Sequence, residues 1–447
     1  MHKTSIKNRA LALAPVAALA SVLAMASFPA AAAAPADDVR ELKAAMDALQ
    51  KRIDELETRT RSADETNDKQ TDQIALAKAN MGTWVQNFTW KGDFRYRNEN
   101  IEQEFAPDRN RDRIRVRAGF VAKVNDTVKV EIGLATAEYG GALTDGGDPR
   151  SSNQTLTNGN SRKAVFADLA YAEWQPNADW KFTVGKMKYP WVRAGQSSFF
   201  DGDVNPEGLA LNFTHGDFFA SSFYNMLEER NSVTVGTTVL PSGESTMGGF
   251  QAGWKPIIGP GRLILGVGYF DVNSVQHRQP VYVGANGNTT TNTGCFSGTG
   301  CLASDYDLMD VFAQYDFTAV AGRPLSLYVE YAKNDKAINK LDTAYSAGIL
   351  YGKASDPRTW EIGYYYAQVE KDALYGEYID SDWGAGNTDA KGSTLKFGYA
   401  FAKGWTFNGT YFLNKTNMDV AASGTGVPAG TFNRDYKRLQ LDLNFKF

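Results

Sequence analysis

Long apolar runs are the first thing that this sequence lacks. Its mean hydropathy is −0.39, and after residue 36 no stretch approaches the ~20 consecutive apolar residues that a membrane-spanning helix needs. Any membrane crossing by this part of the chain would therefore use β-strands. An excess of positive charge is lacking too, because 47 Lys and Arg residues stand against 51 Asp and Glu residues, for a formal net charge of −4. This balance does not indicate a surface for nucleic acid.

Histidine is also scarce, which weakens the case for an enzyme. The histidines are His2, His215 and His277, and His2 falls within the segment that we expect to be removed on export. No grouping of a nucleophile, a base and an orienting residue is visible in the sequence. We therefore expect no enzyme activity, no catalytic residues and no cofactor, with a hydrolase as a less favoured alternative.

Cysteine is limited to Cys295 and Cys301, which lie in a Gly-rich stretch where the backbone can turn easily. In an oxidising compartment such a pair would form a disulfide that closes a loop. The alternative is a pair of metal ligands. Because no histidine or further cysteine lies nearby in the sequence to complete a tetrahedral site, we expect the disulfide and no metal.

The start of the chain has the three parts of a secretory signal peptide. The first nine residues carry three basic groups and no acidic group, residues 10–26 are mainly apolar, and residues 30–36 are rich in small side chains. Signal peptidase cleaves after small residues of this kind. We expect residues 1–36 to direct export and to be removed, with an uncleaved membrane anchor as the alternative.

Residues 37–82 have the pattern of a coiled-coil helix. Their apolar side chains alternate spacings of three and four residues, as the a and d positions of a heptad repeat do. These positions are Val39, Leu42, Met46, Leu49, Ile53 and Leu56. Later positions of the same frame include Asn67 and Gln70, and such polar layers can fix the register. We expect a periplasmic coiled-coil helix that ends at Gly82, or a single amphipathic helix.

From residue 83 to residue 447 the apolar pattern changes to a period of two. Ile114 and Val116, for example, alternate with Arg113, Arg115 and Arg117. A strand between lipid and a polar lumen needs one apolar and one polar face of this kind. The segments with this pattern begin near Phe88, Arg113, Val128, Ala164, Trp180, Gly208, Phe218, Met247, Arg262, Asp307, Leu325, Thr343, Trp360, Ala390, Trp405 and Tyr436.

Brief turns alternate with long loops between these segments, as they do in outer-membrane barrels. Residues 83–447 are therefore predicted to form a transmembrane, antiparallel outer-membrane β-barrel of about sixteen strands, preceded by the short N-terminal α-helical coiled coil. A soluble β-sandwich is the alternative, but it needs fewer strands and leaves sheet edges that lipid could not satisfy. We expect the protein in the outer membrane of a Gram-negative cell, with membrane lipid as a partner.

The final strand places an aromatic residue at its end. Leu439, Leu441, Leu443 and Phe445 lie on the same face as Phe447, which would sit in the aromatic girdle at the membrane interface. A terminal strand that ends in Phe also resembles the signal that barrel-assembly machinery recognises in outer-membrane proteins. We therefore expect Phe447 to be an assembly signal and that machinery to be a partner.

Five segments near the start of the barrel have distinctive sequences. They are Arg111–Phe120, Asp148–Leu156 (at 148, 149 and 152–156), Ala167–Trp174, Gly185–Trp191 and Asp203–Gly208. Together they resemble the bacterial putative porin family, over about the first third of the barrel. The resemblance implies a water-filled channel for passive diffusion of small hydrophilic solutes and ions. Analogy with general porins adds a homo-oligomer, specifically a trimer. The alternative is a structural or adhesin barrel that is anchored by the coiled coil.

Basic side chains collect on the polar faces of the first two strands and the last strand. They are Lys91, Arg95, Arg97, Arg113, Arg115, Arg117, Lys123, Arg438 and Lys446, against Asp93, Glu99 and Asp442. Because the last strand of a closed barrel lies beside the first, these residues would form one basic wall. The members expected to line the pore are Lys91, Arg95, Arg97, Arg113, Arg115, Arg117 and Arg438.

The third long loop, residues 188–207, carries Asp201, Asp203 and Glu207 near its end. In general porins the third loop folds inward and narrows the pore. If this loop does the same, its acids would face the arginines and set up a transverse field that screens solutes by size and charge. Alternatively, the arginines pair with neighbouring strand carboxylates and the loop caps the barrel outside.

Asp201, Asp203, Asn205 and Glu207 place oxygen ligands on alternating residues, and so they partly match the start of a calcium-binding loop. Pro206 and Asn212, however, stand where such a loop needs Gly and a bidentate Glu. Calcium stays open as an alternative, and the favoured interpretation is that the acids line the channel. The identity of the solutes and the preference for anions or cations do not follow from the sequence.

Overall fold

The computed structural model describes residues 36–80, 87–139, 146–195, 197–230, 233–235, 238–240, 243–282, 284–295, 298–319 and 322–447. The chain divides into two compact units, Met1–Gly82 and Thr83–Phe447. Except for Ala36, the predicted signal peptide lies outside the described residues. None of the described helices is both long enough and apolar enough to cross a membrane.

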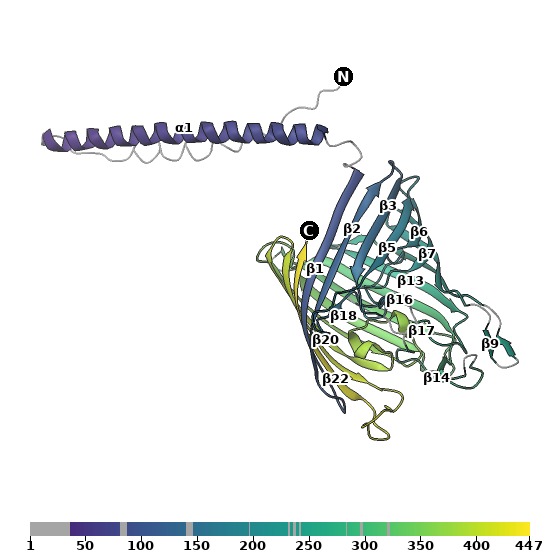
Figure 1. Ribbon diagram of the computed structural model, residues 1–447. Helices are drawn as coiled ribbons and strands as arrows, with labels where there is room; N and C mark the ends of the chain where they lie inside the picture. Colours follow the sequence, from purple (N-terminus) through teal and green to yellow (C-terminus); the bar gives the residue numbers. More distant parts are fainter. Residues whose placement is uncertain are drawn as a thin grey trace. The chain divides into compact units, whose positions relative to one another are not determined.

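The N-terminal unit contains the helix α1 (Ala36–Asn80), which is drawn in purple in Figure 1. Met46 and Leu49, which belong to the predicted heptad seam, are exposed by 65% and 62% of their surfaces. An apolar stripe that is exposed in this way is stabilised when a second helix covers it. The helix is present as predicted, and its coiled-coil partner stays a prediction.

Within the described part of Thr83–Phe447, sixteen strands form a closed antiparallel β-barrel (Figure 1). They are β1 (Phe88–Gln103), β2 (Arg109–Lys123), β3 (Val128–Thr136), β5 (Val165–Trp174), β6 (Trp180–Lys186), β7 (Glu207–His215), β8 (Phe218–Glu228), β11 (Ser245–Trp254), β13 (Gly261–Asn273), β16 (Tyr306–Thr318), β17 (Pro324–Asn334), β18 (Thr343–Gly352), β19 (Trp360–Val369), β20 (Ala390–Ala402), β21 (Trp405–Thr416) and β22 (Arg434–Lys446). Each pairs with the next along the chain, and β22 pairs with β1. The predicted fold class is confirmed.

Short strands complete the described sheet structure. They are β4 (Gln154–Thr155), β9 (Val233–Val235), β10 (Thr238–Leu240), β12 (Ile257–Ile258), β14 (Thr290–Thr291) and β15 (Cys301–Leu302). Strands β4 and β12 extend the barrel sheet, whereas β9 with β10 and β14 with β15 form separate hairpins.

Side chains alternate between the two faces of the barrel wall. On β8, Phe218 and Tyr224 are exposed on the outer face, whereas Phe219, Ser221 and Phe223 are buried on the inner face. Closure leaves no free strand edge, so the backbone polar groups of the ring are satisfied within it, as a bilayer requires. The two-residue period thus assigns each side chain to lipid or lumen, which explains why the strand starts could be placed from the pattern.

Aromatic rings gather on the outer face at the ends of strands that meet in short turns. Ring centroids are 5.2 Å apart for Trp174 and Phe182, and 5.7 Å apart for Trp405 and Phe445. Rings at this position suit a membrane interface, where an apolar body meets a polar boundary. We call this end of the barrel the turn side and the opposite end the loop side.

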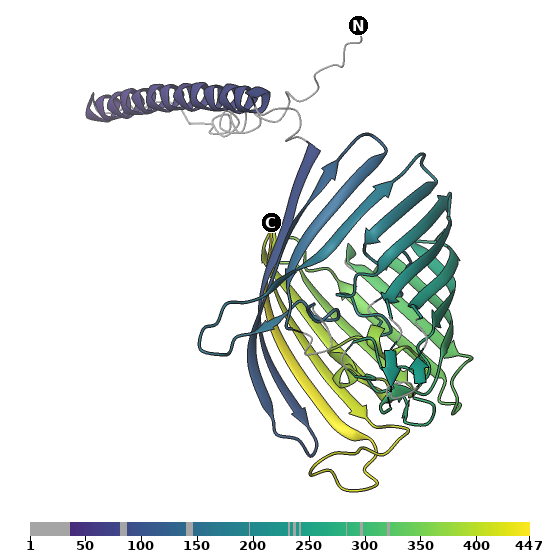
Figure 2. The same ribbon diagram turned by 45° about the vertical axis from the view of Figure 1, so that its right-hand side comes forward.

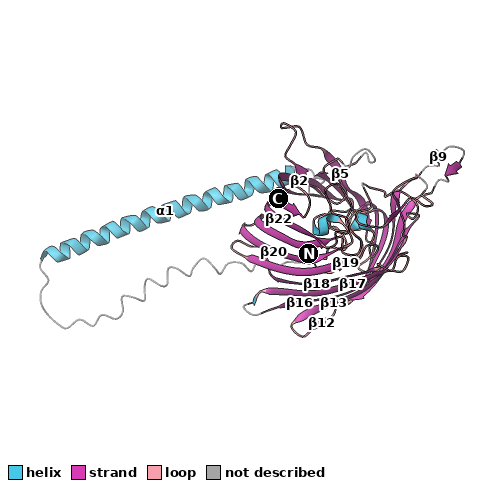
Figure 3. Cartoon of the chain, turned by 90° about the horizontal axis from the view of Figure 1, so that it is seen from below, coloured by secondary structure: helices cyan, strands magenta, loops and turns pink. Residues whose placement is uncertain are grey.

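The long connections join strand ends at the loop side, which is the lower end of the barrel in Figure 2. Counted from the connection between β1 and β2, they include loop 2 (137–164), loop 3 (187–206), loop 5 (274–305) and loop 7 (370–389). Loop 7 contains two short 3₁₀ helices, η3 (Gly376–Tyr378) and η4 (Trp383–Gly386). Figure 3 shows these helices within the ring of strands.

Candidate pore constriction

Loop 3 lies inside the barrel. The centroid of the Trp191 ring is 4.5 Å from that of Phe223 on β8 and 5.2 Å from that of Phe270 on β13, and both of these rings are on the inner wall. The Gln251 side chain on β11 accepts a hydrogen bond from Val192 N at 2.8 Å and donates one to Val192 O at 2.9 Å. These contacts hold the loop against the wall formed by β8, β11 and β13, so it narrows the lumen instead of capping the barrel outside.

Loop 7 also folds inward and contacts loop 3. The Asp201 amide donates to Tyr378 O at 2.6 Å, and the Ser381 amide donates to the Asp201 carboxylate at 2.8 Å. In addition, the Asp380 amide donates to Ser198 O at 3.0 Å. The two loops therefore form one connected layer across the lumen. The inward course of loop 7 could not be predicted from the sequence, because no motif or period distinguishes this loop from an external one.

The predicted basic wall is present on β1, β2 and β22. Arg95 lies opposite Arg115, and Arg97 lies opposite Arg113. Like charges directly opposite one another repel, and carboxylates on the same face separate them. The Arg97 guanidinium bonds Asp442 at 2.7 Å.

The other arginines of the basic wall use carboxylates on the same strands. Arg115 and Arg117 bond Asp93 at 2.8 and 2.9 Å. Glu99 is fully buried and pairs with Arg111, Arg113 and Arg438. The alternative in which strand carboxylates neutralise the arginines therefore describes part of the wall.

A loop carboxylate that the sequence did not single out also faces this wall. Asp382 of loop 7 lies 3.0 Å from Arg97 and 2.7 Å from Arg438. Burial alone would raise the pKa of Asp382, but the guanidinium groups of Arg438 and Arg97 outweigh it and hold that pKa below its ordinary value. Asp382 is therefore ionised and ties loop 7 to the first and last strands.

The three acids predicted in loop 3 have three different environments. Asp203 accepts from Ser152 N and Oγ at 3.1 and 3.0 Å and lies 3.4 Å from the Arg117 guanidinium. Burial opposes its ionisation, yet Arg115 and Arg117 lower the pKa of Asp203 to about 2. Asp203 is therefore the loop 3 acid that faces the basic wall.

Asp201 and Glu207 do not share the position of Asp203. Asp201 contacts loop 7, and its burial, together with the neighbouring Asp380, raises the pKa of Asp201 well above its ordinary value. Glu207 begins β7 and pairs with Lys186 at 2.8 Å. Among the residues that the structure describes, no group of three or more His, Cys, Asp or Glu side chains is arranged to hold a metal ion.

Exposure divides the basic wall into two sets. The side chains of Arg97 and Arg438 are exposed by 5% and 4%, and Arg95, Arg113 and Arg115 are similarly covered. Arg117 and Lys91, in contrast, are exposed by 26% and 49%. Arg117 and Lys91 are therefore the members of the basic wall whose side chains are the most accessible.

Loop 2 covers part of the basic wall. Asn153 accepts two hydrogen bonds from the Arg95 guanidinium, at 2.6 and 3.2 Å, and its backbone oxygen accepts one from Arg113 at 3.2 Å. These contacts of Asn153 could not be predicted from the sequence, because its partners are about 40 to 60 residues away in the chain.

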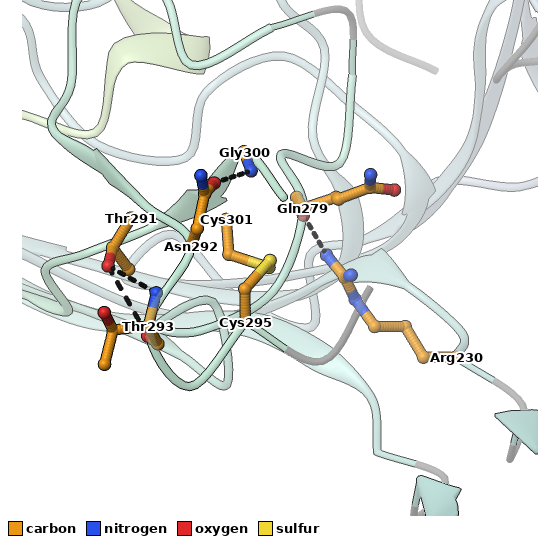
Figure 4. The surroundings of a disulfide bond; sticks show 8 residues. All are labelled: Arg230, Gln279, Thr291, Asn292, Thr293, Cys295, Gly300 and Cys301. Atoms are coloured by element: carbon orange, nitrogen blue, oxygen red, sulfur yellow. Dashed lines mark hydrogen bonds between the residues drawn. A yellow bond between two sulfur atoms is a disulfide. The ribbon is translucent and has the colours of Figure 1, made fainter. Parts of the chain in front are cut away.

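The two cysteines lie in loop 5, away from the basic wall. A disulfide joins Cys295 and Cys301, with an S–S distance of 2.03 Å (Figure 4). Beside it, the Asn292 side chain accepts a hydrogen bond from Gly300 N at 3.0 Å. Arg230 donates to Gln279 O at 2.9 Å and so links the preceding loop to loop 5. The disulfide thus closes a short turn at the loop side.

Comparison with solved structures finds outer-membrane barrels. Pseudomonas putida OprB at high pH has a TM-score of 0.53 and 14% identity, covering 81% of this chain and 95% of that one. OmpT of Vibrio cholerae in its trimer form has a TM-score of 0.45 and 14% identity, over 80% and 99% of the two chains. A triple mutant of the Rhodopseudomonas blastica porin has a TM-score of 0.42 and 12% identity, over 80% and 100%.

No curated protein matches the chain. The likeness to OprB supports the barrel fold. A family model described as putative porin matches residues 103–293 and 266–447, which together make up most of the barrel. The chain therefore belongs to the putative porin family.

Proposed function

We propose that this chain is an outer-membrane porin that lets small hydrophilic solutes and ions diffuse passively, without enzymatic activity. The observation that carries the proposal is a closed sixteen-stranded barrel whose inner face holds charged groups and whose loop 3 lies in the lumen. Barrels of this strand number enclose an aqueous lumen. A polar inner wall keeps water and solutes in contact with hydrogen-bonding groups along the path.

Selectivity is assigned to the opposition of the basic wall and the inward loops. Arg117 and Lys91 contact solutes, while Arg95, Arg97, Arg113, Arg115 and Arg438 add to the field from behind their partners. Asp203 and Asp382 supply the opposite charge. Because these charges lie in a confined space, they orient dipolar solutes and screen ions.

The helix belongs to a proposed assembly. Residues 37–82 would form a coiled coil in the periplasm, and the barrels would associate as homotrimers by analogy with general porins. The exposed seam of α1 supports association. Phe447 would serve assembly with the barrel-assembly machinery, and the disulfide would keep loop 5 closed in the oxidising environment outside the cytoplasm.

Single-channel recording in a planar lipid bilayer tests the function. Purified, refolded protein should give discrete open steps whose size rises with salt concentration, because ions carry the current through water. Heat-denatured protein from the same preparation is the control. A barrel that only anchors or adheres would give no steps, and that result would refute the channel.

A further inference from the structure

Two cavities lie along the inner wall that β3 and β5 form. The first, of about 520 Å³, is on the loop side and is lined by Ala135 and Phe166 on the wall and by Glu377 of loop 7. The second, of about 280 Å³, is lined by Lys91 and Glu131 and is nearer the turn side. Asp168 on β5 lines both cavities, so they adjoin the same point of the wall.

Loop 3 separates the two cavities through a small set of polar contacts. The Asn205 side chain donates to the Asp168 carboxylate at 2.7 Å and accepts from the Lys188 ammonium at 2.9 Å. Beside this bridge, Asp203 lies 3.4 Å from Arg117. Lys188 and Arg117 line the turn-side cavity, whereas Asp203 and Asn205 line the loop-side cavity. The Lys188–Asn205 and Arg117–Asp203 contacts therefore join a residue of one cavity directly to a residue of the other.

We propose that solutes cross the barrel between these two cavities, along the wall of β2, β3 and β5, and that the Asn205 side chain obstructs the passage between them. We call the contact residues Asp168, Lys188, Asn205, Asp203 and Arg117 the gate. The inference rests on the proposed porin function and names the residues that decide it. Among the described residues, Arg95, Arg97, Arg113, Arg115 and Arg438 line neither cavity. The covered arginines therefore do not touch solutes on this path.

The gate also indicates a class of solute. It holds two carboxylates, Asp168 and Asp203, and two cations, Lys188 and Arg117, so that its formal charges balance. An ion of either sign meets groups at the gate that repel it beside groups that attract it, so neither sign of charge gains a net advantage there. A small zwitterion can offer its ammonium to Asp168 and its carboxylate to Lys188, and so replace both hydrogen bonds of Asn205. The geometry favours small zwitterions such as amino acids.

The conductance of an Asn205→Ala variant tests whether the Asn205 side chain obstructs the passage between the cavities. Loss of the amide should raise single-channel conductance about twofold, because the gap between the cavities widens. Asn225→Ala is the matched control, since Asn225 is a buried residue on the inner face of β8 and lines neither cavity. Its conductance should equal that of the wild type.

Thiol labelling provides a second measurement. Asn205→Cys should lose most of its current when a methanethiosulfonate reagent reacts with it, and Asn225→Cys should not. If the wild type conducts and neither Asn205 variant differs from its Asn225 control, the path is refuted while the porin function stands. If neither the wild type nor Asn205→Ala conducts, both are refuted.

Swelling of proteoliposomes tests the solute class with glycine and its uncharged isomer glycolamide. After subtraction of protein-free liposomes, the wild type should admit glycine faster. Asp168→Asn combined with Lys188→Met should lower the glycine-to-glycolamide ratio by about twofold or more, because both charges that match the zwitterion are lost. An unchanged ratio in a variant that still conducts would refute the zwitterion preference.

Discussion

The ring of Phe447 lies over Gly92 of β1, in the space that a side chain at Gly92 would need. A Cβ at Gly92 would come within 2.5 Å of the Phe447 ring, and the two residues exchange backbone hydrogen bonds of 3.0 and 3.1 Å. Phe447 therefore extends the pairing between β22 and β1 by one residue pair. Its ring lies on the outer face, as Phe445 and Trp405 do.

Replacement of Phe447 should impair closure of the barrel. Phe447→Ala leaves the space over Gly92 empty and removes an interfacial ring, so we expect less folded protein in the outer membrane and more degradation in the periplasm. Phe447→Tyr keeps the ring and is the control. Quantitative blotting of outer-membrane fractions measures the effect, and equal amounts of the Ala and Tyr variants would contradict the role.

Asp382→Asn should destabilise the barrel by roughly 3 kcal/mol, because Arg97 and Arg438 would lose a charged partner in a buried setting. Asp380→Asn is a close control two residues away. The Asp380 carboxylate accepts hydrogen bonds from the Asp382 and Trp383 amides at 2.8 and 3.1 Å, and the side-chain oxygen of the Asn variant can still accept them. Urea unfolding in lipid vesicles compares the two, and equal stability of both variants would show that Asp382 does not tie loop 7 to the wall.

Ion selectivity should follow exposure on the basic wall and ionisation in loop 3. Arg117→Gln should shift the reversal potential toward cations more than Arg113→Gln, because Arg117 is exposed to the lumen. Asp203→Asn should shift it toward anions. Asp201→Asn should have little effect, because the raised pKa of Asp201 favours its neutral form. Reversal potentials in a salt gradient measure each shift, and an equal response of the two Asp variants would contradict the assignment.

Asp203 should also make the stability of the barrel depend on pH. Its pKa is about 2 in the folded protein against an ordinary value of 3.8, so folding favours the ionised form. This contribution is complete above pH of about 4 and is lost as the pH falls toward 2. Between pH 5 and about 2, the free energy of unfolding should therefore change less with pH for Asp203→Asn than for the wild type. Denaturant unfolding curves at several pH values measure this change. Identical slopes would mean that the contact with Arg117 is not formed.

Deletion of residues 37–82 should weaken a homotrimer, because the exposed seam of α1 would no longer hold the subunits together. Leu49→Asp combined with Leu56→Asp should act in the same way by charging the seam. Lys51→Asp, which lies off the seam, is the control. Native mass spectrometry of detergent-extracted protein reports the oligomer, and a monomeric wild type would refute the assembly.

The sequence predicts the barrel well because one physical rule governs every strand. Lipid and lumen impose an alternation of period two. Each of the predicted strand starts from Val128 onward lies within two residues of the start of an observed strand. Closure then places β22 beside β1, so the grouping of Arg438 with Arg97 could be predicted as well.

The interior of the barrel follows no such rule. Asp201 and Asp203 are two residues apart, yet one faces loop 7 and the other faces Arg117. Their difference depends on how loops 3 and 7 pack, which is a tertiary property with no local period. Asp382 and Asp168 were missed for the same reason, because their partners come from distant parts of the chain. Asn205 was assigned only to the calcium alternative, and its contact with Asp168 could not be predicted.

Asp382 forms ion pairs with Arg97 of β1 and Arg438 of β22. These two arginines are neighbours because β1 pairs with β22 when the barrel closes. Before that pair forms, the two guanidinium groups are apart and cannot hold one carboxylate together. The inward fold of loop 7 is therefore completed by the same event that seals the wall. A barrel in which β1 and β22 have not yet paired would have a wider lumen and a lower selectivity for solutes. The selectivity of the channel therefore depends on complete closure of the barrel.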